Sequence, residues 1–236
     1  MKLCVVLPAL NEEPIIEASC RVVLSFLRRE LPSWQSELIV VDNGSTDRTA
    51  EIVQTLAARE PVLRYQRVAR VGKGAAIRAG WQAADANVYV FMDADLATDL
   101  AALPALVEAV RSGRVDIAIG SRYAPGAVVE RDWLRRLVSR GYQLVFRWLL
   151  RVPIRDAPCG FKAISRTVRD ALLPQIRNDA WFFDSELVAR AAHAGYRMVE
   201  IPVRWHEPVV AGRSSKVKIW SLSVRYFQEV LALRRT

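Results

Sequence analysis

Short runs of apolar residues, each followed at once by polar residues, mark the first half of the chain. The runs have the length of strands, and their unbroken apolar character is typical of strands that are buried on both faces of a parallel sheet. Four such strands are predicted, at residues 3–7, 38–41, 88–92 and 116–120.

Between these runs, apolar residues recur with the spacing of a helix. Residues 13–30 place apolar side chains on one helical face, and Pro32 marks the exit. Residues 43–47 (NGSTD) supply turn and N-cap chemistry for a second helix at about residues 48–59. Because the strands alternate with crossover helices, the pattern predicts an α/β fold with a Rossmann-like sheet.

Polar side chains gather where the predicted strands end. In an open α/β sheet, ligands bind beyond the carboxyl ends of the strands, where loops and helix N-termini meet. The functional site is therefore expected among these residues: Asn11, Glu12, Asp42, Asp93, Asp95, Ser121 and Arg122.

Asp93 and Asp95 follow an apolar run directly and are separated by Ala94. If this segment is extended, alternate side chains point the same way, so both carboxylates could hold one hard divalent cation and leave positions for water and phosphate. The alternative is a solvated pair of acids at a strand end, because an Asp-x-Asp sequence is common by chance. The pair is thus a candidate site for Mg²⁺ or Mn²⁺ bound against a diphosphate.

The composition is that of an ordinary globular protein. The chain has 236 residues, of which 52% are hydrophobic and 25% charged, which excludes disordered, collagenous and disulfide-framework classes and fits one α/β domain. The three cysteines define neither a zinc site nor a disulfide framework. The two histidines belong to no Ser/His/Asp set and no metal-spaced set, which argues against hydrolase triads and zinc mechanisms.

The net charge of +9 lies entirely in the second half of the chain. Residues 1–118 carry 13 basic and 15 acidic side chains, whereas residues 119–236 carry 21 and 10. This asymmetry indicates that the second half meets something anionic, such as nucleic acid, a phosphorylated substrate or an acidic membrane surface. A general bias of the source proteome toward arginine is the alternative, since 29 of the 34 basic residues are Arg.

Two segments of this basic half, residues 131–151 and 216–235, interleave arginine or lysine with tryptophan and aliphatic residues. Such helices can lie in a bilayer interface while their basic side chains reach lipid phosphates. A core-facing helix with solvated arginines is the alternative. Because no signal peptide and no uncharged 18-residue window are found, a cytoplasmic protein that is peripheral on the cytoplasmic face of a membrane is expected.

Five segments occur in a characteristic order and spacing: residues 6–13 (VLPALNEE), 40–47 (VVDNGSTD), 72–80 (GKGAAIRAG), 93–95 (DAD) and 120–123 (GSRY). Together they resemble glycosyltransferase family 2. Further segments are similar to the branch that makes polyprenyl- or dolichyl-phosphate sugars, with glucose synthases nearest and mannose synthases next: residues 93–98 (DADLAT), 156–162 (DAPCGFK), 181–187 (WFFDSEL), 201–205 (IPVRW) and 215–217 (SKV).

The resemblance implies a GT-A fold in a single domain over residues 1–236, with a nucleotide-sugar-binding half at 1–123 and an acceptor- and membrane-facing half at 124–236. It implies a set of donor-binding residues: Pro8, Asn11, Glu12, Asp42, Lys73, Ala94 and Lys216. It implies four catalytic residues, of which the first two also bind the metal: Asp93, Asp95, Arg122 and Asp156. Arg135 and Ser139, four positions apart on one helical face, would bind the phosphate of a lipid acceptor.

Some of these residues also have purely structural alternatives. Pro8 could simply end a strand and Asp42 could cap a turn, while Lys73 and Arg78 could belong to a structural helix-entry loop, since the segment lacks the spacing of a P-loop. Two departures from the mannose-synthase pattern stand out. Ala97 replaces a glutamine ligand, which favours the glucose type, and Val210 replaces an arginine for which Arg213 is the nearest substitute.

The function that follows is an inverting, metal-dependent transfer of a hexose from UDP-glucose or GDP-mannose to a polyprenyl phosphate. The expected partners are the nucleotide sugar, the polyprenyl phosphate and a membrane surface, reached directly or through a separate membrane-anchor protein, with no nucleic acid. Asp156 is expected to orient an arginine or the sugar rather than act as a base. The alternatives are a family 2 transferase with a soluble saccharide or protein acceptor, and a non-catalytic nucleotide- or RNA-binding module.

Overall fold

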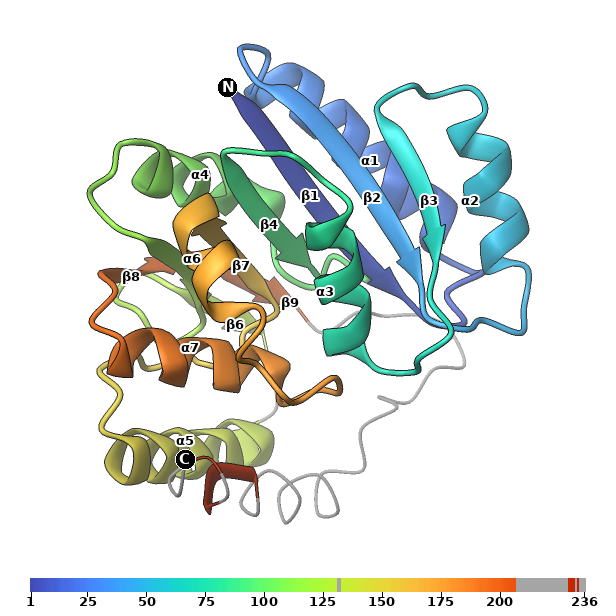
Figure 1. Ribbon diagram of the computed structural model, residues 1–236. Helices are drawn as coiled ribbons and strands as arrows, with labels where there is room; N and C mark the ends of the chain where they lie inside the picture. Colours follow the sequence, from blue (N-terminus) through green and yellow to red (C-terminus); the bar gives the residue numbers. More distant parts are fainter. Residues whose placement is uncertain (131–132, 207–228, 232, 234–236) are drawn as a thin grey trace.

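The structure is a computed structural model that describes residues 1–130, 133–206, 229–231 and 233 (Figure 1). Within these ranges, the side chains of residues 133–140 and 142 are not described. Of the helices within the described ranges, none combines the length and the apolar character needed to cross a bilayer.

A central sheet of seven strands runs through the described part of the molecule, in the order β3-β2-β1-β4-β7-β5-β8. Its members are β1 (Lys2–Ala9), β2 (Gln35–Asp42), β3 (Leu63–Arg67), β4 (Val88–Met92), β5 (Ile117–Ser121), β7 (Phe161–Ser165) and β8 (Met198–Pro202). Two further strands, β6 (Val128–Glu130) and β9 (Arg204–His206), pair in parallel with each other.

Strand β7 is inserted antiparallel between β4 and β5, whereas the other neighbours in the sheet run parallel. Two antiparallel steps restore the direction, so β5 runs the same way as β4. The carboxyl ends of β1, β2, β4 and β5 therefore share one edge of the sheet, and β7 begins at that same edge. Register confirms this, because Met92 at the end of β4 pairs with Phe161 at the start of β7.

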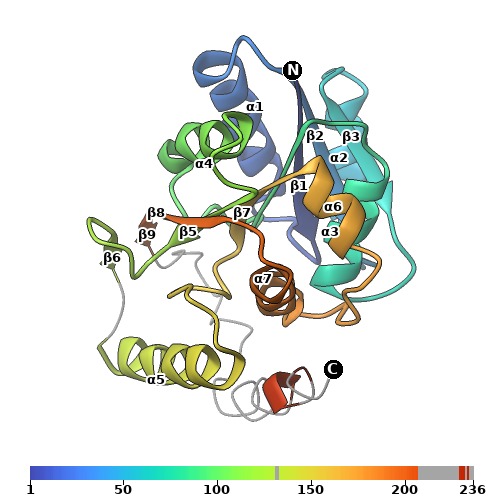
Figure 2. The ribbon, with the colours of Figure 1, turned by 60° about the vertical axis from the view of Figure 1, so that its left-hand side comes forward.

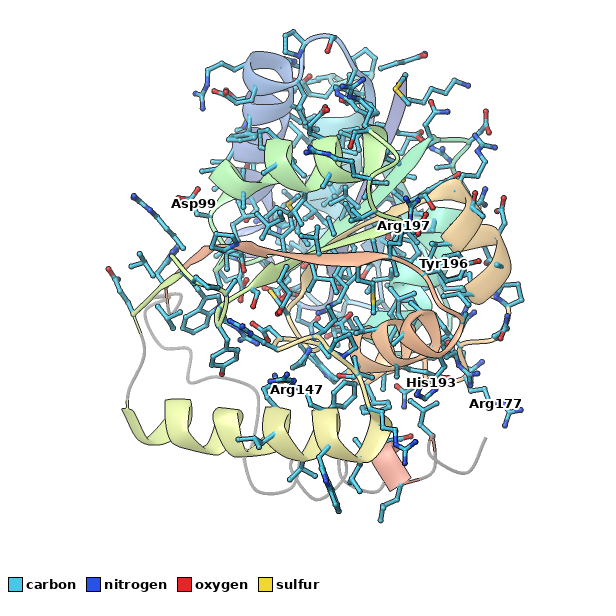
Figure 3. All side chains as sticks on the ribbon, turned by 90° about the vertical axis from the view of Figure 1, so that its left-hand side faces the viewer. Asp99, Arg147, Arg177, His193, Tyr196 and Arg197 are labelled. Atoms are coloured by element: carbon cyan, nitrogen blue, oxygen red, sulfur yellow. The ribbon has the colours of Figure 1, made fainter. Side chains whose placement is uncertain are left out.

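Helices cover both faces of the sheet (Figures 1 and 2). One face carries α1 (Ile16–Glu30), α2 (Thr49–Ala57) and α4 (Leu103–Arg111), the last preceded by a 3₁₀ turn at Leu100–Ala102, and the other face carries α3 (Lys73–Gln82), α6 (Arg166–Leu172) and α7 (Phe183–His193). Helix α5 (Trp133–Leu150) lies beyond α7, farther from the sheet. His193 Nε2, on the side of α7 that faces α5, lies 2.8 Å from the carbonyl oxygen of Leu150 (Figure 3).

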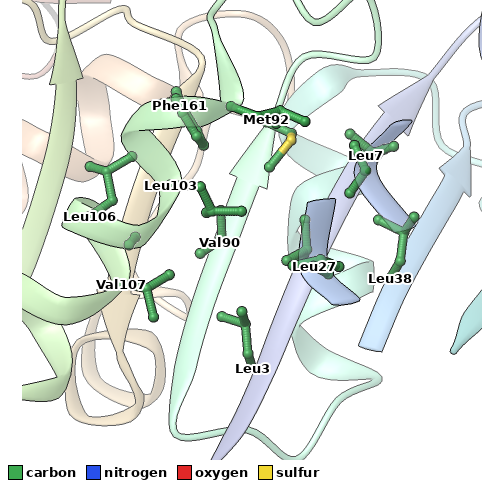
Figure 4. Close-up of a cluster of buried hydrophobic side chains, with 14 of the residues drawn as sticks. Leu3, Leu7, Leu27, Leu38, Val90, Met92, Leu103, Leu106, Val107 and Phe161 are labelled. Atoms are coloured by element: carbon green, nitrogen blue, oxygen red, sulfur yellow. The ribbon is translucent and has the colours of Figure 1, made fainter. Parts of the chain in front are cut away.

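Two apolar layers hold the helices to the sheet. On the side of α1 and α4, side chains such as Leu7, Leu27 and Val90 are almost wholly buried and pack together (Figure 4). On the other side, Trp81 of α3 is fully buried against Phe91 and Phe183. Since the middle strands are buried on both faces, their sequences are continuous apolar runs rather than alternating ones.

The four predicted strands and the two predicted helices of the first half are confirmed, with α1 beginning at Ile16 rather than at residue 13. The sheet is larger than those four strands, because β3, β7 and β8 also belong to it. The expectation that residues 93–95 continue in extended form is wrong. The chain turns there, Leu96 donates its amide to the carbonyl oxygen of Asp93, and Leu96 has a φ of 49°.

Candidate active site

The predicted donor-site residues of the first two loops lie together at the carboxyl edge of the sheet. Asn11 has a φ of 53°, and its side-chain Oδ1 accepts the amide of Thr46 at 2.8 Å. The amide of Asn11 in turn donates to Ser45 Oγ at 2.9 Å, and the amide of Glu12 donates to Thr49 Oγ1 at 2.8 Å. These bonds tie the loop after β1 to the loop after β2.

Asp42 ends β2 with a side chain that is fully buried. Its Oδ1 accepts the amide of Ser45 at 2.8 Å and its Oδ2 accepts the hydroxyl of Tyr65 at 2.9 Å. Burial and this hydrogen bond to the Asp42 carboxylate raise the pKa of Tyr65 to about 12. The carboxylate thus shapes the turn between β2 and α2, and its contact with a donor base or ribose stays a prediction. Pro8, in β1, is partly exposed.

The turn after β4 carries the two acids of the predicted metal site. Asp93 is about half-buried, with 40% of its side chain exposed, Asp95 is exposed, and Ala94 between them is buried. Asp95 Oδ1 accepts the amide of Ala97 at 3.1 Å. A tight turn, and not the alternation of an extended strand, therefore presents the two carboxylates.

Gly160, immediately before β7, makes room for Asp93. A Cβ atom at this position would lie 2.0 Å from Asp93 Oδ2 and 2.5 Å from its Cγ. Because β7 starts at the edge where β4 ends, the chain passes directly against the carboxylate. Only glycine permits this close approach without displacing the acid.

The acid pair lies in an environment that disfavours its negative charge. The pKa of Asp95 is raised by desolvation and by the negative charges of Asp93 and Glu12. A cation would relieve this repulsion, because carboxylates are the preferred ligands of hard divalent ions. Among the described residues, no group of three His, Cys, Asp or Glu side chains gathers in a way that could hold a metal, so an ion here would also need oxygens from a ligand or from water.

Lys73, at the start of α3, lies beside this pair. Its Nζ is 2.7 Å from Asp93 Oδ1 and 3.0 Å from Asp184 Oδ2, and only 8% of its side chain is exposed. The two carboxylates raise the pKa of Lys73 against the opposing effect of burial. The lysine is thus held next to the predicted metal ligand, and its contact with a donor phosphate stays a prediction.

The N-terminus of α3 is covered by the loop that precedes α7. The amides of Gly74 and Ala75 donate to the carbonyl oxygens of Ala180 and Asp179, so they are already satisfied by this loop. Arg78 donates to the carbonyl oxygens of Leu173 and Ile176 and to Asp179. These contacts favour the alternative in which Arg78 has a structural role and does not bind a donor phosphate.

Arg122 and Asp156 form a buried ion pair at the end of β5. Arg122 donates its amide and its Nε to Asp156 Oδ2, at 2.8 and 2.9 Å, and its second terminal nitrogen to Oδ1 at 2.8 Å. Asp156 is fully buried and 14% of the Arg122 side chain is exposed. Gln143 of α5 also donates to Asp156 Oδ1, at 3.4 Å. With both oxygens engaged, Asp156 holds the Arg122 side chain in place, and the role of this pair in sugar transfer stays a prediction.

The remaining predicted residues belong to parts of the chain for which no contacts are described. Arg135 and Ser139 lie on α5, but their side chains are outside the described set. Lys216 and Arg213 lie outside the described residues altogether.

No role was predicted for Asp184 or Gly160, although both belong to segments that resemble the polyprenyl-phosphate sugar synthases. Asp184 contacts Lys73 from 111 positions away, and Gly160 contacts Asp93 across the antiparallel strand. No specific signal was present in the sequence, because acids such as Asp184 and Glu186 are ordinary in the first turn of a helix.

Both the sequence and the structure are similar to those of known proteins. The model of the family described as glycosyl transferase family 2 matches residues 4–173. Glycosyltransferase AglD of Haloferax volcanii is 42% identical over 206 residues, which are 87% of this chain and 33% of that protein. The dolichyl-phosphate beta-glucosyltransferase of Saccharomyces cerevisiae is 29% identical over 98% of this chain and 74% of its own length. The chain thus spans a third of one relative and about three quarters of the other.

Two solved structures share the fold. Glucosyl-3-phosphoglycerate synthase from Mycobacterium tuberculosis, in complex with Mn²⁺, UDP and phosphoglyceric acid, covers 99% of this chain and 78% of its own with a TM-score of 0.72 and 22% identity. A mannosyltransferase from Pyrobaculum calidifontis, in complex with GDP-Man and Mn²⁺, covers 98% and 64% with a TM-score of 0.65 and 21% identity. The expected α/β GT-A fold is confirmed, and the family match and relatives show that the chain belongs to glycosyltransferase family 2 and is an enzyme.

Proposed function

We propose that this chain transfers a hexose from UDP-glucose or GDP-mannose to a polyprenyl phosphate, with inversion at the anomeric carbon, and that residues 1–236 act as one domain. The acceptor class is supported by the relatives that are dolichyl-phosphate glucosyl- and mannosyltransferases. The donor class is supported by the solved structures of the same fold, which contain UDP or GDP-Man.

The observation that carries the proposal is the acid pair Asp93 and Asp95 at the carboxyl edge of the sheet, where the cation in contact with Asp93, Lys73, is shared with Asp184. Asp93 and Asp95 lie on one tight turn, exposed or half-exposed, and the pKa of Asp95 is raised by desolvation of its carboxylate and by the neighbouring negative charges. Gly160 leaves space for the Asp93 carboxylate. These features fit Mg²⁺ or Mn²⁺, which Asp93 and Asp95 would hold. When bound, such an ion offsets the negative charge of a departing nucleoside diphosphate.

The contribution of the chain itself is positioning. A phosphate monoester is already anionic near neutral pH, so it needs no strong general base to attack an anomeric carbon. Arg122, fixed by three hydrogen bonds to Asp156, is pre-organised to face a phosphate group at the edge of the site. Lys216 is assigned to the donor diphosphate, and Arg135 and Ser139 to the acceptor phosphate, by their place in the family pattern.

Peripheral contact with the cytoplasmic face of a membrane, directly or through a separate anchor protein, is part of the proposal. Its support is the described part of α5, where Leu144 and Trp148 expose 69% and 78% of their surface next to the exposed Arg147. An exposed tryptophan beside an arginine is typical of helices that lie in a bilayer interface.

The test combines purified protein with each radiolabelled sugar nucleotide, polyprenyl phosphate and Mg²⁺ or Mn²⁺, and counts the label in the organic phase. Transfer is expected with one donor, and it should disappear with chelator and in Asp95→Ala. The matched control is Asp85→Ala, whose carboxylate pairs with Lys2 at the amino end of β1, so it lies at the opposite edge of the sheet. This control should transfer sugar at the wild-type rate.

The stereochemistry is read from the anomeric coupling constant of the product, where a β-linked sugar from an α-linked donor indicates inversion. Full transfer in chelator would reject the metal role. Transfer to a soluble saccharide or protein in the absence of lipid phosphate would replace the acceptor assignment, and binding of nucleotide or RNA without any transfer would reject the catalytic proposal.

A further inference from the structure

Lys73 is a buried cation shared by two carboxylates. Its Nζ contacts Asp93 Oδ1 at 2.7 Å and Asp184 Oδ2 at 3.0 Å. The two acids differ in exposure, since Asp184 exposes 3% of its side chain and Asp93 exposes 40%. The lysine therefore bridges an acid at the solvent edge of the site and an acid inside the protein.

Asp184 has room for a second hydrogen bond from this lysine. Its other oxygen, Oδ1, is buried and has no hydrogen-bond partner among the described residues. A buried carboxylate oxygen without a donor is costly, and an ammonium group carries three donors. The Phe91 and Trp181 rings lie 5.5 and 5.4 Å from Lys73 Nζ. Both rings attract a cation, so a small displacement of Nζ toward Asp184 keeps it in favourable surroundings.

A divalent cation at Asp93 conflicts with Lys73 in its present place. Two like charges a few ångströms apart repel each other strongly inside a protein, where the effective dielectric constant is far below that of water. Lys73 cannot withdraw into solvent, because its side chain is 8% exposed. The acceptor within reach that is not itself part of the proposed metal site is Asp184.

We propose that Lys73 is the resident counter-ion of Asp93 in the metal-free protein, and that Asp184 is a positioning residue that receives Lys73 when a divalent cation takes Asp93. Asp184 thereby sets the affinity for the cation without touching it. This inference rests on the proposed metal site at Asp93 and Asp95.

The test is the affinity for Mn²⁺ without donor, measured by titration calorimetry and by the loss of the free-ion electron paramagnetic resonance signal. Asp184→Asn should weaken binding by roughly tenfold or more, as substitutions behind a metal ligand commonly do, because Lys73 then remains with Asp93. The double variant Lys73→Met/Asp184→Asn removes the competing cation together with its buried partner. It should bind Mn²⁺ at least as tightly as the wild type.

Asp179→Asn is the matched control. Asp179 also pairs with cations next to α3, Arg70 at 2.7 Å and Arg78 at 3.2 Å, but not with Lys73. Its substitution should leave the Mn²⁺ affinity unchanged. Thermal unfolding followed by circular dichroism establishes that each variant is folded. If Asp184→Asn alone does not fold, the double variant, which removes both members of the buried Lys73–Asp184 pair, is compared with the wild type instead.

Two results would overturn the inference: wild-type affinity in Asp184→Asn, or a double variant that binds more weakly than the wild type. A merely structural role for Asp184 predicts the second result, because removing two buried groups should then harm the site at least as much as removing one. Failure of the proposed function is a different outcome, in which the wild type itself binds no Mn²⁺ or Asp95→Ala binds it unchanged.

Discussion

The buried pair of Arg122 and Asp156 allows a controlled measurement of what burial adds to an ion pair. The chain contains a second pair with the same three hydrogen bonds between arginine and aspartate. Arg197 donates its amide and Nε to Asp116 Oδ2, at 2.9 and 3.1 Å, and a terminal nitrogen to Oδ1 at 3.1 Å. The two pairs differ in burial: the exposed fractions are 14% and 0% for Arg122 and Asp156, and 60% and 23% for Arg197 and Asp116.

The substitutions to compare are Asp156→Asn and Asp116→Asn, at pH 7. Removing one partner of a buried pair costs about 3–5 kcal/mol, and since asparagine keeps one acceptor oxygen we expect a cost of about 3 kcal/mol for Asp156→Asn. An exposed pair contributes about 0.2–1 kcal/mol. For a chain of this length, 1 kcal/mol corresponds to a change in Tm of about 2–4 °C. The expected losses in Tm are therefore about 6–12 °C for Asp156→Asn and at most about 4 °C for Asp116→Asn.

The assay is thermal unfolding followed by circular dichroism, with a urea titration as a second measure of the free energy of unfolding. The hydrogen bonds from Arg197 lower the pKa of Asp116. A lowered pKa stabilises the folded state above the unfolded-state value of about 3.9, and this contribution is lost as the pH falls through the folded-state pKa. The difference between wild type and Asp116→Asn should therefore shrink as the pH falls below about 3.9.

Sugar transfer provides the second readout of the same two variants. At a temperature where both are folded, Asp156→Asn should lose roughly 100-fold in transfer rate, because a displaced Arg122 no longer faces its phosphate, whereas Asp116→Asn should keep the wild-type rate. Equal losses of stability in the two variants would refute the argument from burial. An unchanged transfer rate in Asp156→Asn would refute the positioning role of Asp156.

Two further substitutions test the walls of the site. Gly160→Ala should weaken Mn²⁺ binding by about tenfold or more with little loss of Tm, because the added Cβ would displace the Asp93 carboxylate. The control is Gly141→Ala, since a Cβ atom at that position meets nothing within 4 Å. Titration calorimetry measures the Mn²⁺ affinity of both variants. Tyr65→Phe should cost about 2 kcal/mol in urea unfolding at pH 8, because a buried oxygen of Asp42 loses its donor. The raised pKa of Tyr65, about 12 against about 10 in the unfolded chain, stabilises the wild type below pH 10, and this contribution is lost between pH 10 and 12. The gap between wild type and Tyr65→Phe should therefore narrow in that range, and a constant gap would contradict the assignment.

The strands that could be predicted are buried and have unbroken apolar runs, whereas β7 is buried as well but its run is interrupted by Lys162. β1, β2, β4 and β5 are covered on both faces, so their sequences are unbroken apolar runs that need no knowledge of their neighbours. β3 is an edge strand, so it is only partly buried and its sequence, Leu-Arg-Tyr-Gln-Arg, is largely polar. β8 forms the other edge of the sheet and is also only partly buried. Strands of this kind carry too weak an apolar signal to be recognised without their partners.

The candidate site was predictable as a set of residues but not as a set of contacts. The rule that ligands bind at the carboxyl ends of strands placed Asp93 and Arg122 at one edge, which the structure confirms through the parallel course of β4 and β5. The antiparallel insertion of β7 brings Gly160 to that edge, and no local pattern indicates such an insertion. Pairings such as Lys73 with Asp184, 111 positions apart, depend on that global topology.

The charged side chains around Asp93 and Asp95 explain why a divalent cation is expected at this site. Among the described residues near the acid pair, Lys73 and Arg122 are each held by their own buried carboxylate, Asp184 and Asp156. Lys162, also buried, donates to the carbonyl oxygen of Cys159, and burial lowers its pKa. Cations that are already compensated in this way give little net attraction to a nucleoside diphosphate, while the turn after β4 adds two carboxylates of its own. A divalent ion on that turn would make the electrostatic interaction between the turn and the donor diphosphate attractive instead of repulsive. Donor binding should therefore depend on the ion before any bond is broken.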